Sequence, residues 1–556
     1  MLRIIAATLC LTLIGCGTAK PFSERDIEGA QRVAGLDFTD EEIETLRGNL
    51  ERNLRSFEDL RSFPLDNSVP PVLWFEPRPP GFQMPKGPDA VTLPLPESVD
   101  LPANGEFAFL PASHLGALLR DGKVTSVALT EYFLNRLRTH DPVLKAVVNL
   151  TAERALEQAR KADAEIAAGN WRGPLHGVPY GVKDLLAVPG YPTTWGAGPY
   201  RDQVIDKTAA VVQRLDEAGA VLVAKLTSGE LASGDRWFGG RTVTPWDTTT
   251  GASGSSAGPG SATAAGLVPF AIGTETWGSI ISPSTRNGLT GLRPTYGVVS
   301  RAGAMTLSWS LDKIGPMCRS ALDCALVFDA IRGQDPEDPS TVSVPLEVGG
   351  ARDWSSIRVG YLKAAFDRDS TATGNNARAA MEVFRQMGVQ MDSVSLPTGP
   401  RWSGVISTII RGESGAVFDQ LLQENLDDQL YWQSSSSRAN SLRQSRFIPA
   451  AEYIQANRHR GLLIAGMDSV FQKFDLILTP SGADGSVTNL TGHPVITMKS
   501  GYRVPDDRPA VRLPTGVALV GRLYEEGLLL DAAMAYQKLA PFHDDHPPAF
   551  NGGQRP

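Results

Sequence analysis

The pattern of hydrophobic positions predicts a first helix between residues 38 and 63. Apolar side chains recur there at steps of three and four, the spacing of one helix face, at Ile43, Leu46, Leu50, Leu54, Phe57 and Leu60. Thr39 and Glu42 have the spacing of a capping box, and Pro64 follows as a stop signal. We expect this amphipathic helix to pack on the main body of the protein rather than to bind a partner.

From residue 110 onward, helical and strand patterns alternate. This order is typical of an α/β sheet whose faces are covered by helices. The predicted helices are 126–139, 152–168, 208–218, 320–332 and 377–387, and the predicted strands are 146–150, 181–186, 220–224, 357–362 and 474–482. Residues 398–460 show no clean period, and we expect them to cover a pocket; whether they form a lid is left open.

A proline-rich stretch separates the first helix from this alternating region. Between Pro64 and Pro102 lie 11 of the 40 prolines, so this stretch cannot be helical. It is either a tether or an extended arm wrapped on the following domain. Its apolar residues, which include Trp74, Phe75 and Phe82, favour the wrapped arm.

The N-terminus has the features of an export signal. Arg3 precedes an apolar run at 4–14, which is too short for a transmembrane helix of about 20 residues. The run ends Leu-Ile-Gly-Cys, which resembles a bacterial lipobox, so we expect Cys16 to become the first mature residue and to carry lipid that anchors the protein to a membrane. Gly17 favours the outer membrane of the cell envelope; a soluble periplasmic protein is the alternative.

The composition allows a large core and argues against one class of partner. With 42% hydrophobic residues, a chain of 556 residues can bury a large core. The net charge of −8 is mild and no block of like charge stands out, so we expect no nucleic acid partner. A homodimer stays open.

Two further features were candidates for other chemistry. Cys318 and Cys324 lie six residues apart at the start of a predicted helix, a spacing that holds their Cα atoms beyond disulfide reach. We therefore expect free core thiols. The run HDDH at 543–546 could suggest a metal site, but the tail that follows has the composition of an exposed segment, and we expect no metal there.

One lysine lies in an apolar run and is a candidate general base. Lys183 follows Tyr180 and Val182 and precedes two leucines. A lysine base must be neutral, although its ordinary pKa is about 10.4. Burial can lower that value, and each pKa unit costs about 1.36 kcal/mol. In a strand, Asp184 would point to the opposite face and would not stabilise the charged amine. The alternative for any lysine is a solvated side chain.

A Gly/Ser-rich run at 251–280 contains two candidate serines, Ser255 and Ser279. Small residues allow backbone N–H groups to converge on an anion, and the sequence ATAA at 262–265 is a good helix opening. The run also satisfies G-x-S-x-G with Ser256 as nucleophile, a motif that requires an apolar strand directly before it. The preceding TPWDTTTGAS is predicted to be a loop, and we reject that motif.

Together these segments resemble the amidase signature family. The stretches GVPYGVKDLLAVPG, GASGSSAGPGSATAAG and GTETWGSIISPSTRNGLTGLRPTYGVVSRAG occur in the family's order, within a resemblance that runs from about residue 107 to residue 540. By position, the resemblance implies Ser279 as the nucleophile, Ser255 as a bridging serine on a cis peptide, and Lys183 as the base.

The resemblance implies an amide hydrolase that works through an acyl-enzyme, without metal or organic cofactor. It assigns the oxyanion hole to backbone N–H groups of Thr276, Trp277, Gly278 and Ser279. The implied fold is three-layer α/β/α, with a large mixed, twisted sheet covered by helices. The expected organisation is a lipoprotein signal peptide at 1–15, a helix and proline-rich arm at 16–106, a catalytic domain at 107–546 and a tail at 547–556. Expected polar framework residues are Asp184, Lys225, Asn287, Arg293, Asp312 and Arg319.

The sequence departs from the family pattern beside the nucleophile. Trp277 replaces a glycine or acidic residue, and we expect its ring either to form a wall of the acyl pocket or to pack outward. Ile281 and Ser282 stand where several relatives carry an arginine, which favours a small-molecule substrate that is a neutral, fairly hydrophobic amide. An esterase and a catalytically idle binding lipoprotein remain alternatives. The catalytic component of a tRNA-dependent amidotransferase shares the signature, but export would separate it from charged tRNA.

Overall fold

The computed structural model describes residues 22–550, which divide into one part that ends at Asp66 and a second that begins at Asn67. The predicted signal peptide and Cys16 lie outside the described residues, so both stay predictions. Within the described range, no helix is long and apolar enough to cross a membrane.

The first part contains two helices in contact with each other, α1 (Glu24–Ala34) and α2 (Asp40–Arg61). The predicted capping box of α2 is confirmed: the N–H of Thr39 donates to Glu42 Oε2 at 2.8 Å, and the N–H of Glu42 donates to Thr39 Oγ1 at 3.4 Å. Helix α1 was not predicted from the sequence, although it too begins with a capping box. The packing of α2 on the main body stays a prediction.

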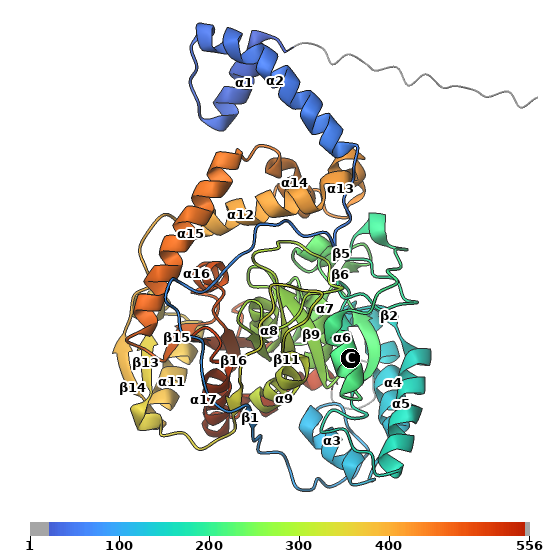
Figure 1. Cartoon of the computed structure of the whole chain (residues 1–556). Coiled ribbons are helices and arrows are strands. Elements are labelled where there is room, and N and C mark those ends of the chain that lie inside the picture. Colours follow the sequence, from blue (N-terminus) through green and yellow to red (C-terminus); the bar gives the residue numbers. More distant parts are fainter. Residues whose placement is uncertain (1–21, 551–556) are drawn as a thin grey trace, which may run out of the picture. The chain divides into compact units, whose positions relative to one another are not determined.

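The second part is built on one large mixed sheet of 11 strands (Figure 1). Parallel pairs join β13 to β14 and β15 at one end and β3 to β4 and β9 near the other, while the central pairs are antiparallel. In spatial order the strands are β14 (Gln390–Ser393), β13 (Arg358–Tyr361), β15 (Leu476–Pro480), β17 (Leu513–Gly521), β16 (Val495–Arg503), β10 (Thr290–Arg293), β11 (Lys313–Cys318), β9 (Phe270–Glu275), β3 (Pro179–Lys183), β4 (Val221–Leu226) and β2 (Val147–Leu150).

Alternate residues of these strands enter hydrophobic clusters on opposite faces of the sheet. On β9, Phe270 and Ile272 belong to one cluster, and Ala271 between them belongs to another. On β15, Leu476 and Ile477 divide in the same way. Because successive strand side chains point to opposite faces, the sheet is buried on both sides and forms the middle layer of an α/β/α fold.

The helices supply the two outer layers. On one face pack α3 (Ala112–Arg120), α6 (Ala210–Glu217), α9 (Ala321–Ile331), α10 (Lys363–Arg368), α11 (Ala372–Gln386) and α17 (Glu526–Leu539). On the other pack α5 (Ala152–Ala167), α7 (Ala257–Ala264), α8 (Ile281–Asn287), α12 (Trp402–Val417), α15 (Ala450–Phe471) and α16 (Gly485–Thr491). Helix α4 (Ser126–Leu144) contributes to clusters on both faces. The remaining helices are α13 (Asp419–Gln423) and α14 (Arg438–Ser445), and the remaining strand pairs are β1–β12 (Ala90–Val91, Glu347–Val348), β5–β6 (Arg236–Trp237, Gly240–Arg241) and β7–β8 (Val243–Thr244, Asp247–Gly251).

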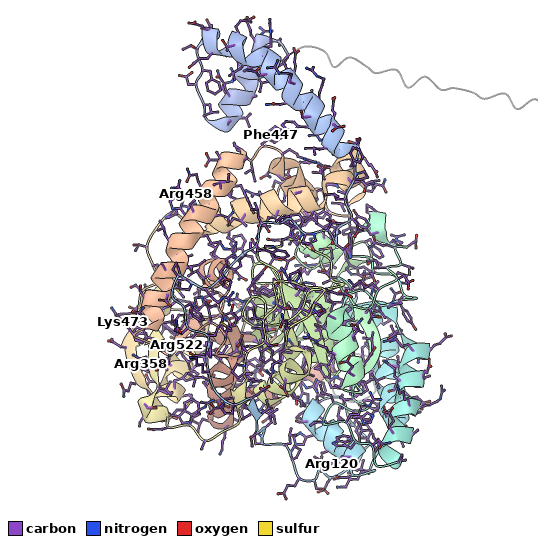
Figure 2. The ribbon with its side chains drawn as sticks, in the orientation of Figure 1. Arg120, Arg358, Phe447, Arg458, Lys473 and Arg522 are labelled. Carbon is purple, nitrogen blue, oxygen red and sulfur yellow. The ribbon has the colours of Figure 1, made fainter. Side chains whose placement is uncertain are left out.

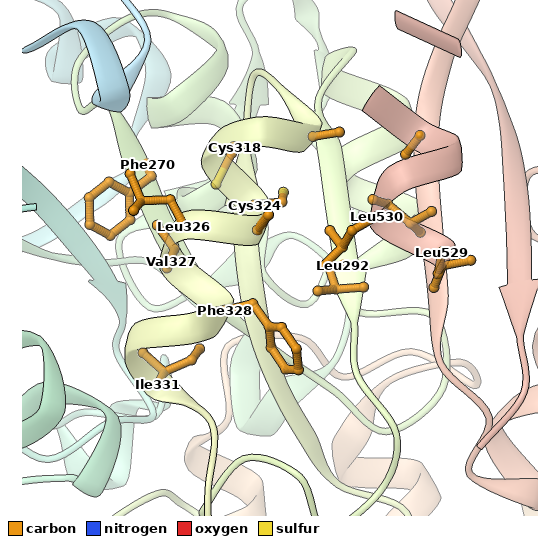
Figure 3. Close-up of a cluster of buried hydrophobic side chains, with 14 of the residues drawn as sticks. Phe270, Leu292, Cys318, Cys324, Leu326, Val327, Phe328, Ile331, Leu529 and Leu530 are labelled. Carbon is orange, nitrogen blue, oxygen red and sulfur yellow. The ribbon is translucent and has the colours of Figure 1, made fainter. Parts of the chain in front are cut away.

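Ion pairs stabilise the outer end of the sheet, and apolar packing fills its centre. Arg358 and Arg522 both pair with Asp475, at 2.8 and 2.7 Å (Figure 2). In the core, Cys318 and Cys324 are buried free thiols among apolar neighbours such as Phe328 (Figure 3). The prediction of free core thiols is therefore confirmed.

The proline-rich stretch follows the surface of the second part, as the wrapped-arm interpretation predicted. The Phe75 ring meets Tyr296 edge-on with centroids 4.9 Å apart, and the guanidinium of Arg460 lies 3.4 Å from the Phe75 centroid. Further along, Phe82 contacts Tyr524 at 5.9 Å. These contacts attach the arm to the loop after β10 and to helix α15.

Two predictions about irregular segments were wrong. Residues 398–460 are mostly helical, in α12 to α15, because Val405, Ile406, Ile409 and Ile410 form a buried stripe at helical spacing. The tail at 547–550 is not exposed throughout, because Phe550 is fully buried in a cluster with residues of α4 and α5.

Candidate active site

Lys183 ends strand β3 and is fully buried. Its Nζ donates to Ser255 Oγ at 2.8 Å and to Thr274 Oγ1 at 2.8 Å. Burial lowers the pKa of Lys183 well below its ordinary range, although the carboxylates of Asp312 and Glu275 oppose this shift. The site therefore holds an amine that is neutral more readily than an exposed lysine and can accept a proton.

Asp184 points away from Lys183, as expected for adjacent residues of a strand. Its Oδ1 lies 2.8 Å from Lys225 Nζ, and both side chains are fully buried. The Thr194 N–H donates to the other carboxylate oxygen at 2.9 Å. The neighbouring carboxylate is thus already paired with a different lysine.

Ser255 lies beside the segment that carries Ser279. The Gly254–Ser255 peptide is cis, as the family resemblance implied, and Ser255 is 1% exposed. The N–H of Ser256 donates to the carbonyl oxygen of Ser279 at 3.2 Å. The two serine segments therefore run side by side. Ser279 is half-buried and lines a cavity of about 390 Å³.

Ser256 is excluded as a nucleophile by its surroundings. It is fully buried, and its Oγ donates to the Thr274 carbonyl at 3.1 Å and accepts from the Thr274 N–H at 3.2 Å. The segment before it is not the predicted loop: it forms the polar strand pair β7–β8, outside the main sheet. Helix α7 also begins at Ala257, earlier than the predicted opening at 262, because the small residues 257–261 pack inside the fold.

The turn between β9 and α8 presents backbone donors beside the nucleophile. Among the described residues, none accepts a hydrogen bond from the N–H groups of Thr276, Trp277 or Gly278. Gly278 has a φ of 87°, a left-handed conformation that glycine adopts without strain. Such an arrangement of free donors can hold a developing oxyanion.

Two buried carboxylates brace this turn from behind. Glu275 Oε2 accepts from the N–H groups of Ile280 at 2.8 Å and Ile281 at 3.0 Å. Asp312 Oδ1 accepts from Thr276 Oγ1 at 2.6 Å. The turn is therefore fixed at both ends. Glu275 was not singled out from the sequence; its place directly after strand residue Thr274 in the GTET motif was the available signal.

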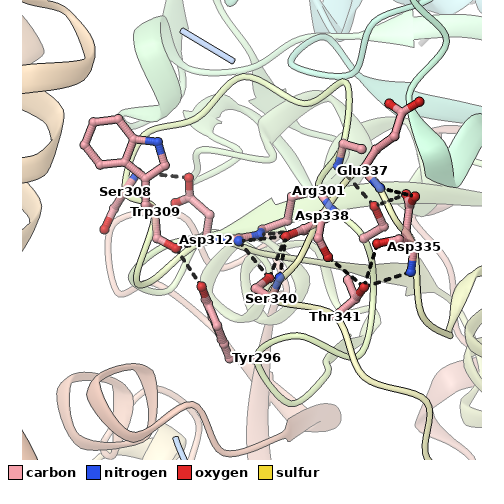
Figure 4. Close-up of polar contacts among 12 residues, drawn as sticks. Tyr296, Arg301, Ser308, Trp309, Asp312, Asp335, Glu337, Asp338, Ser340 and Thr341 are labelled. Atoms are coloured by element: carbon pink, nitrogen blue, oxygen red, sulfur yellow. Dashed lines mark hydrogen bonds and ion pairs between the residues drawn. The ribbon is translucent and has the colours of Figure 1, made fainter. Parts of the chain in front are cut away.

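Each brace is itself held by charged or polar partners. Arg293 Nη1 lies 2.7 Å from Glu275 Oε1; although burial alone would raise the pKa of Glu275, this arginine lowers it to about 2. Asp312 Oδ2 accepts from the N–H groups of Leu307 and Ser308 at 2.8 and 2.9 Å (Figure 4). Arg293 and Asp312 thus have the framework role that the sequence predicted.

The cavity has one wall from the nucleophile turn and another from α12 and α14. Trp277 lines it and is 41% exposed, so the ring contacts both the cavity and solvent. Ile410 and Arg411 of α12 and Arg438 of α14 lie on the other wall. Residues 398–460 therefore do cover the pocket, as predicted.

The other framework residues have structural contacts. Asn287 Nδ2 donates to the Ala252 carbonyl at 2.9 Å, and Arg319 Nη1 donates to the Thr263 carbonyl at 3.1 Å. In the HDDH run, the His546 ring stacks on Phe109 with centroids 4.0 Å apart. Across residues 22–550, no group of three or more His, Cys, Asp or Glu side chains is placed to hold a metal ion.

Comparison with known proteins agrees with this arrangement. The family model described as Amidase matches residues 128–488. The A-type component of the glutamyl-tRNA(Gln) amidotransferase of Rhodopirellula baltica is 33% identical over 495 residues, which is 79% of this chain and 98% of that protein. Its counterpart from Chloroflexus aggregans is 31% identical, over 80% of this chain and 99% of that one.

Among solved structures, the native peptide amidase from Stenotrophomonas maltophilia has a TM-score of 0.69 and 28% identity, over 80% of this chain and 99% of its own. A bacterial aryl acylamidase of the amidase signature family has a TM-score of 0.68 and shares the fold at 23% identity, over 79% of this chain and 98% of its own. The chain belongs to the amidase family and has the amidase signature fold. It is an amide hydrolase that acts on carbon–nitrogen bonds.

Proposed function

We propose that the protein hydrolyses an amide through Ser279, with Ser255 as the proton relay and Lys183 as the base. One observation carries this assignment: a fully buried lysine whose Nζ lies 2.8 Å from Ser255 Oγ, beside the strand that leads to Ser279. Both side-chain hydrogen bonds of Lys183 go to hydroxyl groups, so the proposed relay runs through serine and needs no histidine.

The chemistry follows from these positions. Neutral Lys183 takes the Ser255 proton while Ser255 takes that of Ser279, whose oxygen attacks the amide carbonyl. The N–H groups of Trp277 and Gly278 stabilise the oxyanion. The relay then returns a proton to the leaving amine, the C–N bond breaks, and water repeats the sequence on the acyl-enzyme. The chain's own groups supply every proton and the nucleophile, so we propose no cofactor.

Hydrolysis of matched substrates tests this function. Butyryl 4-nitroanilide and the corresponding 4-nitrophenyl ester differ only in the atom that leaves. We expect the purified protein to cleave the anilide, and Ser279→Ala to lose this activity. Cleavage of the ester alone would favour the esterase alternative, and folded protein that cleaves neither would favour a binding lipoprotein.

The relatives named above support a second candidate, in which the chain is the amidase component of a larger complex. The match covers 98% of the R. baltica amidotransferase component. Under this candidate the isolated chain would need a partner for turnover. Full amidase activity of the isolated chain, measured beside its mass in solution, would favour the stand-alone enzyme.

We also propose that lipid on Cys16 holds the enzyme at the bacterial cell envelope, on the strength of the Leu-Ile-Gly-Cys sequence at 13–16. Incorporation of labelled fatty acid into the full chain, and its loss in Cys16→Ser, tests this proposal. A Cys16→Ser chain that is labelled as strongly as the wild type would refute it.

Two features favour different substrates. Ile281 and Ser282 directly after the nucleophile favour the neutral, fairly hydrophobic amide expected from the sequence. The other wall of the cavity is polar and carries two arginines, which favours a charged substrate.

A further inference from the structure

We propose that the substrate amide carries a carboxylate group and that the guanidinium of Arg411 binds it. This inference rests on the proposed amide hydrolysis at Ser279 and replaces the neutral substrate by a charged one. Arg411 lies in α12, more than 100 positions along the chain from the nucleophile, in a segment whose sequence pattern pointed to no residue role.

The lining of the cavity favours an anion. Besides Ser279, it includes two arginines, six further serines and Gln444. Among the described residues that line it, none is acidic. Guanidinium groups and hydroxyl donors without a neighbouring carboxylate create a site where a negative charge is favoured. A neutral aliphatic substrate would leave these polar groups without partners, which costs free energy.

The two arginines differ in what already occupies them. Arg438 Nε donates to the Leu231 carbonyl at 3.0 Å, and its Nη2 donates to the Ala232 carbonyl at 3.2 Å. Arg438 is therefore engaged in holding the chain near the cavity. Within residues 22–550, the half-buried Arg411 side chain makes neither a hydrogen bond nor an ion pair with another residue. Its planar fork is free for a carboxylate, which it can bind with two parallel hydrogen bonds.

Helix α12 holds Arg411 in a fixed place. Two residues further on, Glu413 is buried and accepts from Ser310 Oγ at 2.6 Å and from the Tyr453 hydroxyl at 2.9 Å. These bonds tie α12 to α15 and to the loop that contains the Asp312 brace. A guanidinium positioned by a rigid helix loses less freedom on binding than one on a mobile loop.

The position after the nucleophile explains why the cation lies across the cavity. Ile281, where several relatives carry an arginine, is buried in the apolar cluster beneath α12. A cation cannot occupy that place without disrupting the packing. The carboxylate partner is supplied instead by the opposite wall, so the carboxylate and the scissile carbonyl must lie at separate ends of the substrate.

Two matched pairs of anilides test the inference with the full chain. Glutaryl and pentanoyl 4-nitroanilide differ by a carboxylate in place of a terminal methyl on the acyl half. The 4-carboxyanilide and anilide of pentanoic acid place the same difference on the amine half. We expect kcat/KM to favour the charged member of one pair by about 10- to 100-fold, the range of a charge-assisted hydrogen bond.

Arg411→Met should abolish that preference, mainly through KM, and leave the rate with the neutral member within about twofold. Arg411→Lys should restore part of it, since a lysine supplies charge without the fork, and it replaces the Met variant if that chain does not fold. Arg458→Met is the matched control, because Arg458 is exposed on α15 and does not line the cavity (Figure 2).

Three outcomes are distinct. A preference for a charged member that Arg411→Met removes supports the inference. Hydrolysis of the neutral members with equal or higher efficiency, or a preference unchanged in Arg411→Met, overturns it while leaving the proposed function intact. Failure of the folded wild type to cleave any of the four anilides would instead count against the proposed function.

Discussion

Lys183 Nζ lies 2.8 Å from Ser255 Oγ in a site with no solvent exposure at the lysine. The amine is desolvated, and its two hydroxyl partners are neutral groups that do not compensate a positive charge. A base that is neutral in the folded protein is the main requirement of a mechanism without histidine.

Replacing the base tests this requirement. We expect Lys183→Met to lower kcat by about 100- to 10,000-fold, the usual contribution of a general base, without lowering the melting temperature. The methionine fills similar space and removes a costly buried amine. Lys225→Met is the contrasting control: it leaves Asp184 buried without its partner and should destabilise the protein by about 3–5 kcal/mol. Equal destabilisation by both changes would contradict a neutral Lys183.

The stability of the Lys183→Met protein should depend on pH in one direction. The pKa of Lys183 is well below 10.5 in the folded protein, so between that lowered value and about 10.5 the unfolded chain binds more protons. Stability of the wild type therefore rises with pH across this window. We expect the advantage of Lys183→Met to shrink as pH approaches 10, measured by denaturant unfolding. An advantage independent of pH would mean that Lys183 is charged in the fold.

Glu275 should couple stability to activity. Its pKa is lowered to about 2, so its contribution is present above about 4.5 and is lost as pH falls toward 2. Glu275→Gln leaves Arg293 buried without a counter-ion, and we expect a loss of about 3–5 kcal/mol in the free energy of unfolding together with a lower kcat. The exposed pair of Glu382 and Arg385 provides a control: Glu382→Gln should cost less than about 1 kcal/mol. Unchanged kcat in a folded Glu275→Gln protein would show that the turn does not depend on this brace.

Trp277 should affect selectivity more than stability. It lines the cavity and is 41% exposed, so Trp277→Gly removes a pocket wall but little buried area. We expect the ratio of kcat/KM between short and long acyl anilides to shift toward bulkier groups, with a change in stability below about 1 kcal/mol. Phe447→Gly, at another exposed aromatic side chain, is the control. An identical substrate profile would assign the ring to outward packing.

Much of the sheet could be predicted from the sequence, because its strands are short apolar runs between clear helical periods. The predicted strand at 220–224 is part of β4, and the predicted helix at 152–168 is α5. The helices of 398–460 were missed because their buried faces are short and are interrupted by polar residues. Only the stripe at 405–410 in α12 carried a readable helical spacing.

The catalytic candidates could be located from sequence, whereas their supporting contacts could not. Lys183, Ser255 and Ser279 lie in distinctive motifs, and their segments meet in the structure. Arg411 gave no such signal, since an arginine on a helix is usually solvated. Its importance depends on which helix covers the pocket, and that is decided by tertiary packing.

The roles of Ser279 as the nucleophile and of Lys183 as the base that activates it are tested most directly by covalent labelling. The purified protein is treated with a fluorophosphonate probe, and the modified residue is mapped by mass spectrometry. We predict one adduct on Ser279, formed at least about 100-fold more slowly in Lys183→Met and in Ser255→Ala. An adduct on Ser256 or Ser255, or undiminished labelling of Ser279 in the folded Lys183→Met protein, would contradict these roles.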